Sequence, residues 1–376
     1  MAAARLVGLS DNDIYFLKSL RHSWWLWKIH KLPLSRFEFP ALPPLDHADR
    51  EIAARIIAFY RRTSGEEGQR SPMWERNLSG VQAPLVRALR RGDEEALANL
   101  LRGMLRNSIV QGIDAGSSYM TGNWRVHSLK LLDGLVSLAE QVGAAKAEFS
   151  QGRAAEALAN GVEPLVEAIE ARLGRKIGVP NVGGPYGLRA GDQLLTLNSA
   201  EYVRMAWRAK QAAPAGPLTV VEIGAGYGAM AFWLMQMTDV ERYAIVDLPE
   251  IGCLQAYYLS RCFGSDSVSL FGETRDAQVR ILPPHALETA GKPTLVINQD
   301  SLPEIPLEAA RRYVAWVRDN LEGVFFSCNH ETLVTGFAVT LVPELVVEVG
   351  GLERIRRDLC WSRPGYVEEV YVPMKP

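Results

Sequence analysis

The sequence is poor in the features that mark several protein classes. It has only four cysteines, and none is spaced as in a CxxC pair or a zinc finger. This scarcity predicts reduced thiols in a cytoplasmic protein rather than a disulfide framework. No apolar run approaches the roughly 20 residues of a transmembrane helix, so no membrane span is expected. The first residues are too soon interrupted by polar ones to suit a signal peptide.

An excess of positive charge is also missing. The chain has 41 Lys and Arg against 43 Asp and Glu, so a nucleic-acid partner is not expected. We find no internal repeat and no low-complexity tail. At 376 residues the chain is long enough for two domains. Its tryptophan-rich segment at 24–27 favours a core or subunit contact over a membrane surface, which is compatible with a homo-oligomer.

Three regions of different character follow one another. Residues 1–173 predict a helical N-terminal domain with a role in substrate binding or oligomerisation. Residues 174–198 carry six glycines and two prolines, which break helices and predict a loop or lid with a plain linker as the alternative. Residues 199–376 alternate strand and helix. Helices are expected at 10–22, 46–62, 82–91, 93–107, 127–143, 151–173 and 199–210, and a loop at 63–77.

The third region predicts an α/β, Rossmann-like sheet that is mostly parallel, because its strands alternate with helices. A C-terminal antiparallel edge strand is expected at 366–372, paired with a strand around 337–347. The other strands are expected at 218–223, 242–247, 267–271, 293–298 and 322–328. Helices are expected at 228–237, 250–263 and 306–320.

The most informative segment is 220–228, VVEIGAGYG. An apolar strand ends in Glu222, and a glycine-rich turn follows, in which backbone N–H groups can face a ligand. This layout resembles class I S-adenosylmethionine (SAM) methyltransferases. A dinucleotide fingerprint and a turn without a ligand are the alternatives. Glu222 suits a cationic amino-acid end, and the third glycine comes one residue early for a dinucleotide. The turn residues expected to bind the cofactor are Gly224, Ala225, Gly226, Tyr227 and Gly228.

Two further strands end in polar residues. Asp247 ends the strand at 242–247, and both it and Leu248 are expected to bind the cofactor. The Asp247 carboxylate suits both hydroxyls of a ribose, and a helix cap is the alternative. Asn298 and Gln299 end the strand at 293–298, where they could meet the methionine part of SAM or the acceptor. Ser301 and Glu304 follow as acceptor-side candidates, with an ordinary helix start as the alternative.

The strand at 322–328 leads to a third polar group. Asn329 and His330 would lie at the same rim of the sheet, Asn329 as a substrate contact. A histidine titrates near neutrality and can take a proton from an alcohol, so His330 is a candidate general base.

The segments VVEIGAGYGAMA, YAIVDLPE and INQDSLPEI, with the strand ending in Asn329, are together similar to the putative sugar O-methyltransferase family. The likeness covers roughly residues 180–335. Ile305 departs from the Met that the family commonly has there. The resemblance implies methyl transfer from SAM, with S-adenosylhomocysteine (SAH) as product, to a sugar hydroxyl of a polysaccharide or glycosylated natural product. The N-terminal 170 residues match no motif, so they do not identify the acceptor.

In-line methyl transfer needs the acceptor oxygen held behind the methyl carbon and a nearby base. Asp300 and Glu304 are candidates besides His330, and His127 is a more remote one. A divalent cation on Asp300, Glu304 and Glu331 is an alternative; their spacing is not diagnostic, and no metal is expected. Aromatic and polar candidates for sugar contacts are Tyr119, Trp124, Arg125, Tyr186 and His127. A small non-sugar acceptor and a binding role without methyl transfer remain alternatives.

Overall fold

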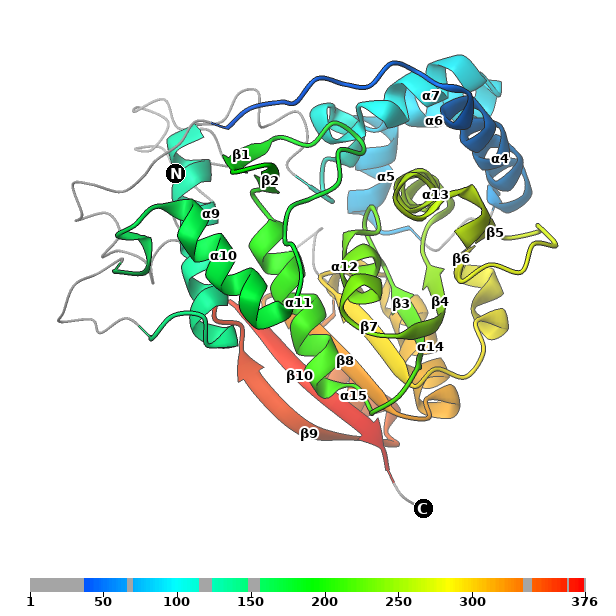
Figure 1. Ribbon diagram of the computed structural model, residues 1–376. Coiled ribbons are helices and arrows are strands. Elements are labelled where there is room, and N and C mark those ends of the chain that lie inside the picture. The colour runs from blue at the N-terminus through cyan, green and yellow to red at the C-terminus, as the bar shows by residue number, and fades with distance from the viewer. Residues whose placement is uncertain are drawn as a thin grey trace, which may run out of the picture.

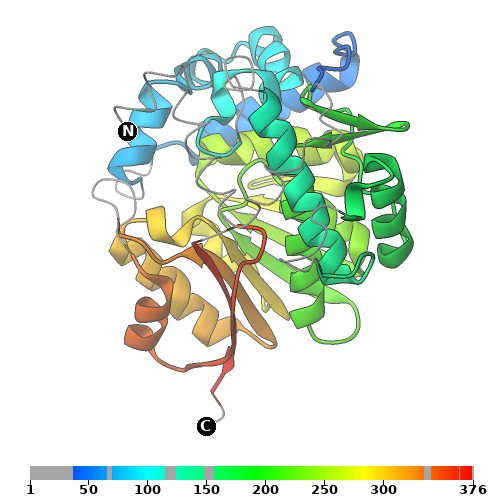
Figure 2. The same ribbon diagram turned by 90° about the vertical axis from the view of Figure 1, so that its left-hand side faces the viewer.

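A computed structural model describes residues 37–65, 70–114, 124–147, 156–333, 340–363 and 365–374. The helix expected at 10–22, the tryptophan-rich segment and Tyr119 lie outside these residues. The described chain forms one eight-stranded sheet with helices on both faces, a two-stranded hairpin, and a group of N-terminal helices beside one end of the sheet (Figures 1 and 2).

The large sheet has the predicted mostly parallel architecture. Its strands are β3 (Leu218–Ile223), β4 (Val240–Val246), β5 (Val268–Leu270), β6 (Val279–Leu282), β7 (Leu295–Gln299), β8 (Val324–His330), β9 (Leu352–Leu359) and β10 (Tyr366–Pro373). They lie in the order β5-β6-β4-β3-β7-β8-β10-β9, and only β10 pairs antiparallel, with β8 and β9. After β3, the strands β4, β5 and β6 are added on one side of β3. The chain then crosses over and places β7 on the other side. This switch leaves a crevice at the carboxyl ends of β3 and β7, where open α/β sheets bind ligands.

Alternate side chains of the parallel strands point to opposite faces and build two cores. Val220 and Tyr243 belong to one core, and Val221 and Ala244 to the other. The first face packs against α11 (Ser199–Ala212), α12 (Ala229–Met237) and α13 (Pro249–Phe263). The second packs against α14 (Leu307–Asn320) and α15 (Val342–Val349). Short 3₁₀ turns lie at η5 (Ser265–Ser267), η6 (Pro284–Thr289) and η7 (Leu302–Glu304).

The N-terminal helices share the first core with the sheet. They are α4 (His47–Thr63), α5 (Pro72–Ser79), α6 (Ala83–Arg91), α7 (Glu94–Arg102), α9 (Trp124–Val142) and α10 (Val162–Leu173), with 3₁₀ turns η2 (Met104–Arg106), η3 (Ser108–Val110) and η4 (Glu156–Leu158). A capping box of Asp46 and Asp49 starts α4. Asp49 also accepts a 2.9 Å hydrogen bond from Tyr257 of α13. A helix with the length and apolar character to cross a bilayer is not found among the described residues.

The glycine-rich segment at 174–198 contains a hairpin of β1 (Gly187–Ala190) and β2 (Gln193–Thr196). Glu38 forms an antiparallel bridge with Gly187, which ties the start of the described chain to this hairpin. The lid role of the segment and the division into domains at 173 and 198 remain predictions.

Several expectations about the elements were wrong. The helix expected at 93–107 ends at Arg102 and is followed by 3₁₀ turns, and the strand β9 was not predicted. Residues 342–349 form a helix where a strand was expected at 337–347, because Val342, Leu345 and Val346 repeat with helical spacing. The predicted edge strand, β10, is interior, and the more polar β9 forms the edge. The four-residue strand β6 was missed. Part of the loop expected at 63–77 is α5, which Ser71 caps and Pro72 opens.

Candidate functional site

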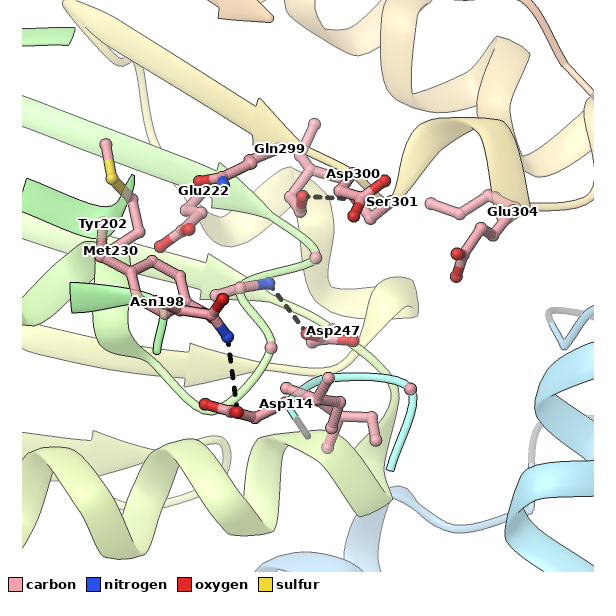
Figure 3. A pocket seen from close by; sticks show the side chains of 18 of the residues that line it. Asp114, Asn198, Tyr202, Glu222, Met230, Asp247, Gln299, Asp300, Ser301 and Glu304 are labelled. Atoms are coloured by element: carbon pink, nitrogen blue, oxygen red, sulfur yellow. Dashed lines mark hydrogen bonds between the residues drawn. The ribbon is translucent and has the colours of Figure 1, made fainter. Parts of the chain in front are cut away.

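A pocket of about 520 Å³ opens at the carboxyl ends of β3, β4 and β7 (Figure 3). The strand tips form its floor. The helices α5, α9 and α11 and the turn between β9 and β10 contribute the walls. Of the predicted cofactor residues, seven line it: Glu222, Gly224, Ala225, Gly226, Asp247, Leu248 and Gln299. Asp300, Ser301 and Glu304 line it as well, so the pocket brings together most of the residues that the sequence singled out.

The turn after β3 needs glycine for two reasons. Gly224 and Gly226 have φ values of 73° and 56°, which lie in the left-handed region that disfavours other residues. A Cβ at Gly224 would also lie 2.2 Å from Oγ of Ser301, which itself donates a 2.9 Å hydrogen bond to the Ile223 carbonyl. The turn is therefore packed directly against the tip of β7.

Glu222 is a buried acid at the floor of the pocket. It is 1% exposed and accepts a 2.7 Å hydrogen bond from the Tyr243 hydroxyl. Burial raises its pKa to about 8, and the charge of Asp247 acts in the same direction. Without a cationic group beside it, this carboxyl is mostly protonated at neutral pH.

Asp247 lies across the glycine turn from Glu222. Its carboxylate accepts the N–H groups of Ala225 (3.0 Å) and Leu248 (2.8 Å), and burial raises its pKa to about 7. The alternative of a helix cap is not supported, since the N-cap residue of α13 is Leu248 and no side chain caps that end. Asp247 instead holds the glycine turn and borders the pocket.

Asn298 and Asn329 face inward rather than into the pocket. The Asn298 amide donates to the Ile223 carbonyl (2.8 Å) and to Ser301 Oγ (2.5 Å), and its oxygen accepts from Asn329 (2.9 Å). Both asparagines are buried and neither lines the pocket. The pair ties together the ends of β3, β7 and β8, so its place is beneath the site.

Tyr227 and Gly228 also lie in packing positions outside the pocket lining. The ring of Tyr227 meets the edges of Tyr202 and Tyr258 at centroid distances of 5.9 and 5.0 Å. A Cβ at Gly228 would lie 3.1 Å from Cγ of Leu259 in α13, a tight contact, and the φ of 95° also favours glycine there. These two residues fix α12 against its neighbours.

Asp300 is held by the turn between β9 and β10. Arg363 donates to its Oδ2 at 2.6 Å and Tyr366 to its Oδ1 at 2.8 Å, while the Arg363 guanidinium stacks 3.7 Å from the centre of the Tyr366 ring. The backbone of Asp300 has a φ of 56°, a strained value for a residue with a side chain. Glu304 lies near Asp300. Its burial and the charge of Asp300 raise the pKa of Glu304 to about 8.

The structure does not bring the remaining candidates to the pocket. His330 lies outside the lining, with its ring 5.7 Å from that of Tyr366. Tyr186 and His127 are buried in an aromatic cluster around Phe37. Trp124 begins α9, where the Arg125 guanidinium covers its ring. Their predicted roles in catalysis or substrate binding have no support from this placement.

Many residues of the pocket lining could not be identified from the sequence. Lining residues that it did not identify include Trp74, Asp114, Lys130, Asp133, Asn198, Glu201, Tyr202, Met230, Arg363 and Tyr366. Half of them are charged or aromatic residues on α5, α9 and α11, which carry no motif. Burial lowers the pKa of Lys130 to about 8, which is the largest such change for a lysine in the described part of the chain. The only sequence feature that pointed to any of these residues was the end of the glycine- and proline-rich segment before α11, because Asn198 and Glu201 lie there.

The acids suggested as an alternative metal site are not assembled as one. Glu331 is paired with Arg357 and Asp300 with Arg363. Within the described residues, the only group with metal-ligand spacing is Cys328, Cys360 and Glu368. The guanidinium of Arg204 contacts both Glu368 and the Cys360 sulfur. A cationic side chain therefore already occupies the position that a metal ion would take.

The three raised pKa values predict how stability depends on pH. Between pH 5 and 7 the folded chain binds more protons at Glu222, Asp247 and Glu304 than the unfolded chain does, so the free energy of unfolding should fall as pH rises. Each carboxyl contributes at most about 1.4 kcal/mol per pH unit. Urea unfolding across this range should show a flatter slope for the triple variant Glu222→Gln, Asp247→Asn, Glu304→Gln.

The matched control is Glu331→Gln, because Arg357 lowers the pKa of Glu331. That carboxyl is ionised in both states above pH 5, so its removal should leave the slope unchanged. A triple variant with the wild-type slope would contradict the prediction.

Comparisons with known proteins show a distant likeness only. No protein-family model matches the sequence, and no curated protein matches it. Among solved structures, the ribosomal protein L11 methylase of Lactobacillus delbrueckii subsp. bulgaricus is 11% identical (47% of this chain, 80% of that chain, TM-score 0.34). The CcbJ methyltransferase of Streptomyces caelestis is 15% identical (46% and 90%, TM-score 0.35). The SAM-bound magnesium protoporphyrin IX methyltransferase of Synechocystis PCC 6803 is 16% identical (49% and 87%, TM-score 0.33). These values are too low to transfer an activity or a substrate.

Proposed function

We propose that this chain is a SAM-dependent O-methyltransferase that acts on a sugar hydroxyl. The observation that carries the proposal is the pairing of Glu222 and Asp247 around a glycine turn at the switch point of the sheet. SAM would supply a methyl group activated by its positive sulfur. The residues at the turn fit such a donor, because Gly224 leaves no room for a side chain, and neither Glu222 nor Asp247 is paired with a cationic side chain among the residues that the structure describes.

Each acid has a separate task at the donor end. The Glu222 carboxyl would ionise beside an ammonium group, which stabilises the charged form that burial alone disfavours. Asp247 would accept a ribose hydroxyl. Beyond Asp247 the lining becomes apolar, with Leu248, Ile251 and Pro284, and this part suits a flat base.

Another part of the lining is polar. It includes Lys130 and Asp133 of α9, Glu201 of α11, Arg363 of the β9–β10 turn and Tyr366 at the start of β10. A wall that combines donors, acceptors and an aromatic ring suits a molecule with many hydroxyl groups better than an apolar one. This supports a sugar as the acceptor.

Two carboxyls replace His330 in the proposed chemistry. Asp300, fixed by Arg363 and Tyr366, would orient an acceptor hydroxyl. Glu304, with its pKa near 8, is mostly protonated at pH 7 and ionises as the pH rises through 8; in its ionised form it would take the proton of that hydroxyl, so turnover should rise with pH in this range. An alcohol that loses its proton as the new bond forms is a stronger nucleophile.

The test is incubation of the purified protein with SAM labelled in the methyl group and a panel of free sugars and glycosides. Label on a sugar oxygen is the expected result. Glu304→Gln should lower the turnover number at least about tenfold and leave SAM affinity within about twofold, since general-base catalysis contributes factors of this order or more. Transfer only to amines or phenols would exclude the sugar, and SAM binding without transfer to any acceptor would favour a binding role.

A further inference from the structure

Gln255 connects Asp247 to the glycine turn. It lies in the second turn of α13 and is fully buried. Its Nε2 donates to Oδ2 of Asp247 at 2.6 Å and to the carbonyl oxygen of Gly226 at 3.0 Å. The Gly226 carbonyl can only accept hydrogen bonds, so the amide nitrogen of Gln255 must face it. No motif in the sequence contains this residue.

We propose that Gln255 is a positioning residue for donor binding, because it fixes the Asp247 carboxylate and determines which of its oxygens faces the donor. The proposal rests on the proposed function, in which Asp247 accepts a ribose hydroxyl. Gln255 itself does not line the pocket and acts through Asp247.

The hydrogen bonds of Asp247 show how this selection works. A carboxylate oxygen has two acceptor positions. Oδ2 uses both, for the Gln255 amide and the Ala225 N–H, whereas Oδ1 accepts the Leu248 N–H and no other donor from the described part of the chain. The remaining acceptor position is therefore on Oδ1. Removal of the Gln255 amide would free the carboxylate to rotate and would present a mixture of orientations.

The surrounding charges give Gln255 a second effect. Glu222 on β3 and Glu250 on α13 are acids near Asp247, and the Tyr313 hydroxyl on α14 also interacts with it. Burial and the charge of Glu250 raise the pKa of Asp247, and the Gln255 amide lowers it. The amide thus helps to keep Asp247 ionised when a donor binds near neutral pH.

The experiment is calorimetric titration of the full chain with SAM and with SAH between pH 6 and 9. In Gln255→Met, which keeps an unbranched buried side chain, we expect about tenfold weaker binding at pH 7, typical of a lost hydrogen bond to a charged group, and partial recovery at pH 9. Gln255→Glu should show the opposite trend, with affinity falling as its new carboxyl ionises beside Asp247. Gln278→Met is the matched control, since Gln278 donates to the Val240 carbonyl at the far end of β4.

A double-mutant cycle separates this role from a structural one. In an Asp247→Ala background, Gln255→Met should cause little further loss, because Gln255 acts through the missing carboxylate. Wild-type affinity in Gln255→Met, or an equal loss in both backgrounds, would overturn the inference. If the wild-type protein binds neither SAM nor SAH, the proposed function fails and the inference fails with it, an outcome distinct from the first two.

Discussion

Arg204→Met should lower the free energy of unfolding by about 3–5 kcal/mol, the cost typical of removing one partner from a buried ion pair. Arg204 is 1% exposed, and its guanidinium contacts Glu368, Glu201 (3.2 Å) and the sulfur of Cys360 (2.7 Å). Its loss would leave the buried Glu368 with Arg208 alone. Urea unfolding monitored by circular dichroism measures the change.

The control for this prediction is Arg311→Met. Arg311 pairs with Glu308 and Glu348 on the surface, where ion pairs contribute at most about 1 kcal/mol. A loss for Arg204→Met no larger than for this surface variant would show that the buried network contributes little to stability.

Gly224→Ala should weaken SAM binding at least about a hundredfold. The left-handed backbone alone costs an alanine roughly 1–2 kcal/mol, and its Cβ would collide with Ser301, so the turn must move away from β7. The backbone N–H groups of the turn and the hydrogen bond between Ala225 and Asp247 would then be displaced from the positions that bind SAM. Calorimetry with SAM and SAH measures the loss.

Gly216→Ala separates backbone strain from collision. Gly216 also has a positive φ, of 103°, but a Cβ there would meet no atom within 4 Å. This variant should lose some stability and keep its SAM affinity. Equal affinities for the two variants would contradict a specific role of the turn at Gly224.

The donor side of the site was predictable because it is local in sequence. Glu222 and Gly224 lie two residues apart, and Asp247 ends the next strand, so an apolar run followed by a polar residue was enough to find them. The same pattern located β3, β4, β7 and β8. It failed for β6, because four residues are too few to show a period, and for α15, where short apolar runs fit a strand or a helix.

The opposite side of the pocket depends on contacts between distant segments. Lys130, Glu201 and Arg363 meet at one pocket although each comes from a different part of the chain. A charged residue on an amphipathic helix looks the same in sequence whether it faces solvent or a ligand. Asn298 shows the reverse error, since its position at a strand tip suggested a ligand contact, whereas its amide holds neighbouring strands together.

The position of β10 has a consequence for the order of folding. This strand follows every other strand of the sheet in sequence, yet it lies between β8 and β9. During synthesis, β9 has no partner until β10 has left the ribosome, and Asp300 and Arg204 lack Tyr366 and Glu368 until then. Productive folding of this half of the molecule must therefore wait for the insertion of its last strand, and a nascent chain released earlier would expose two unpaired strand edges.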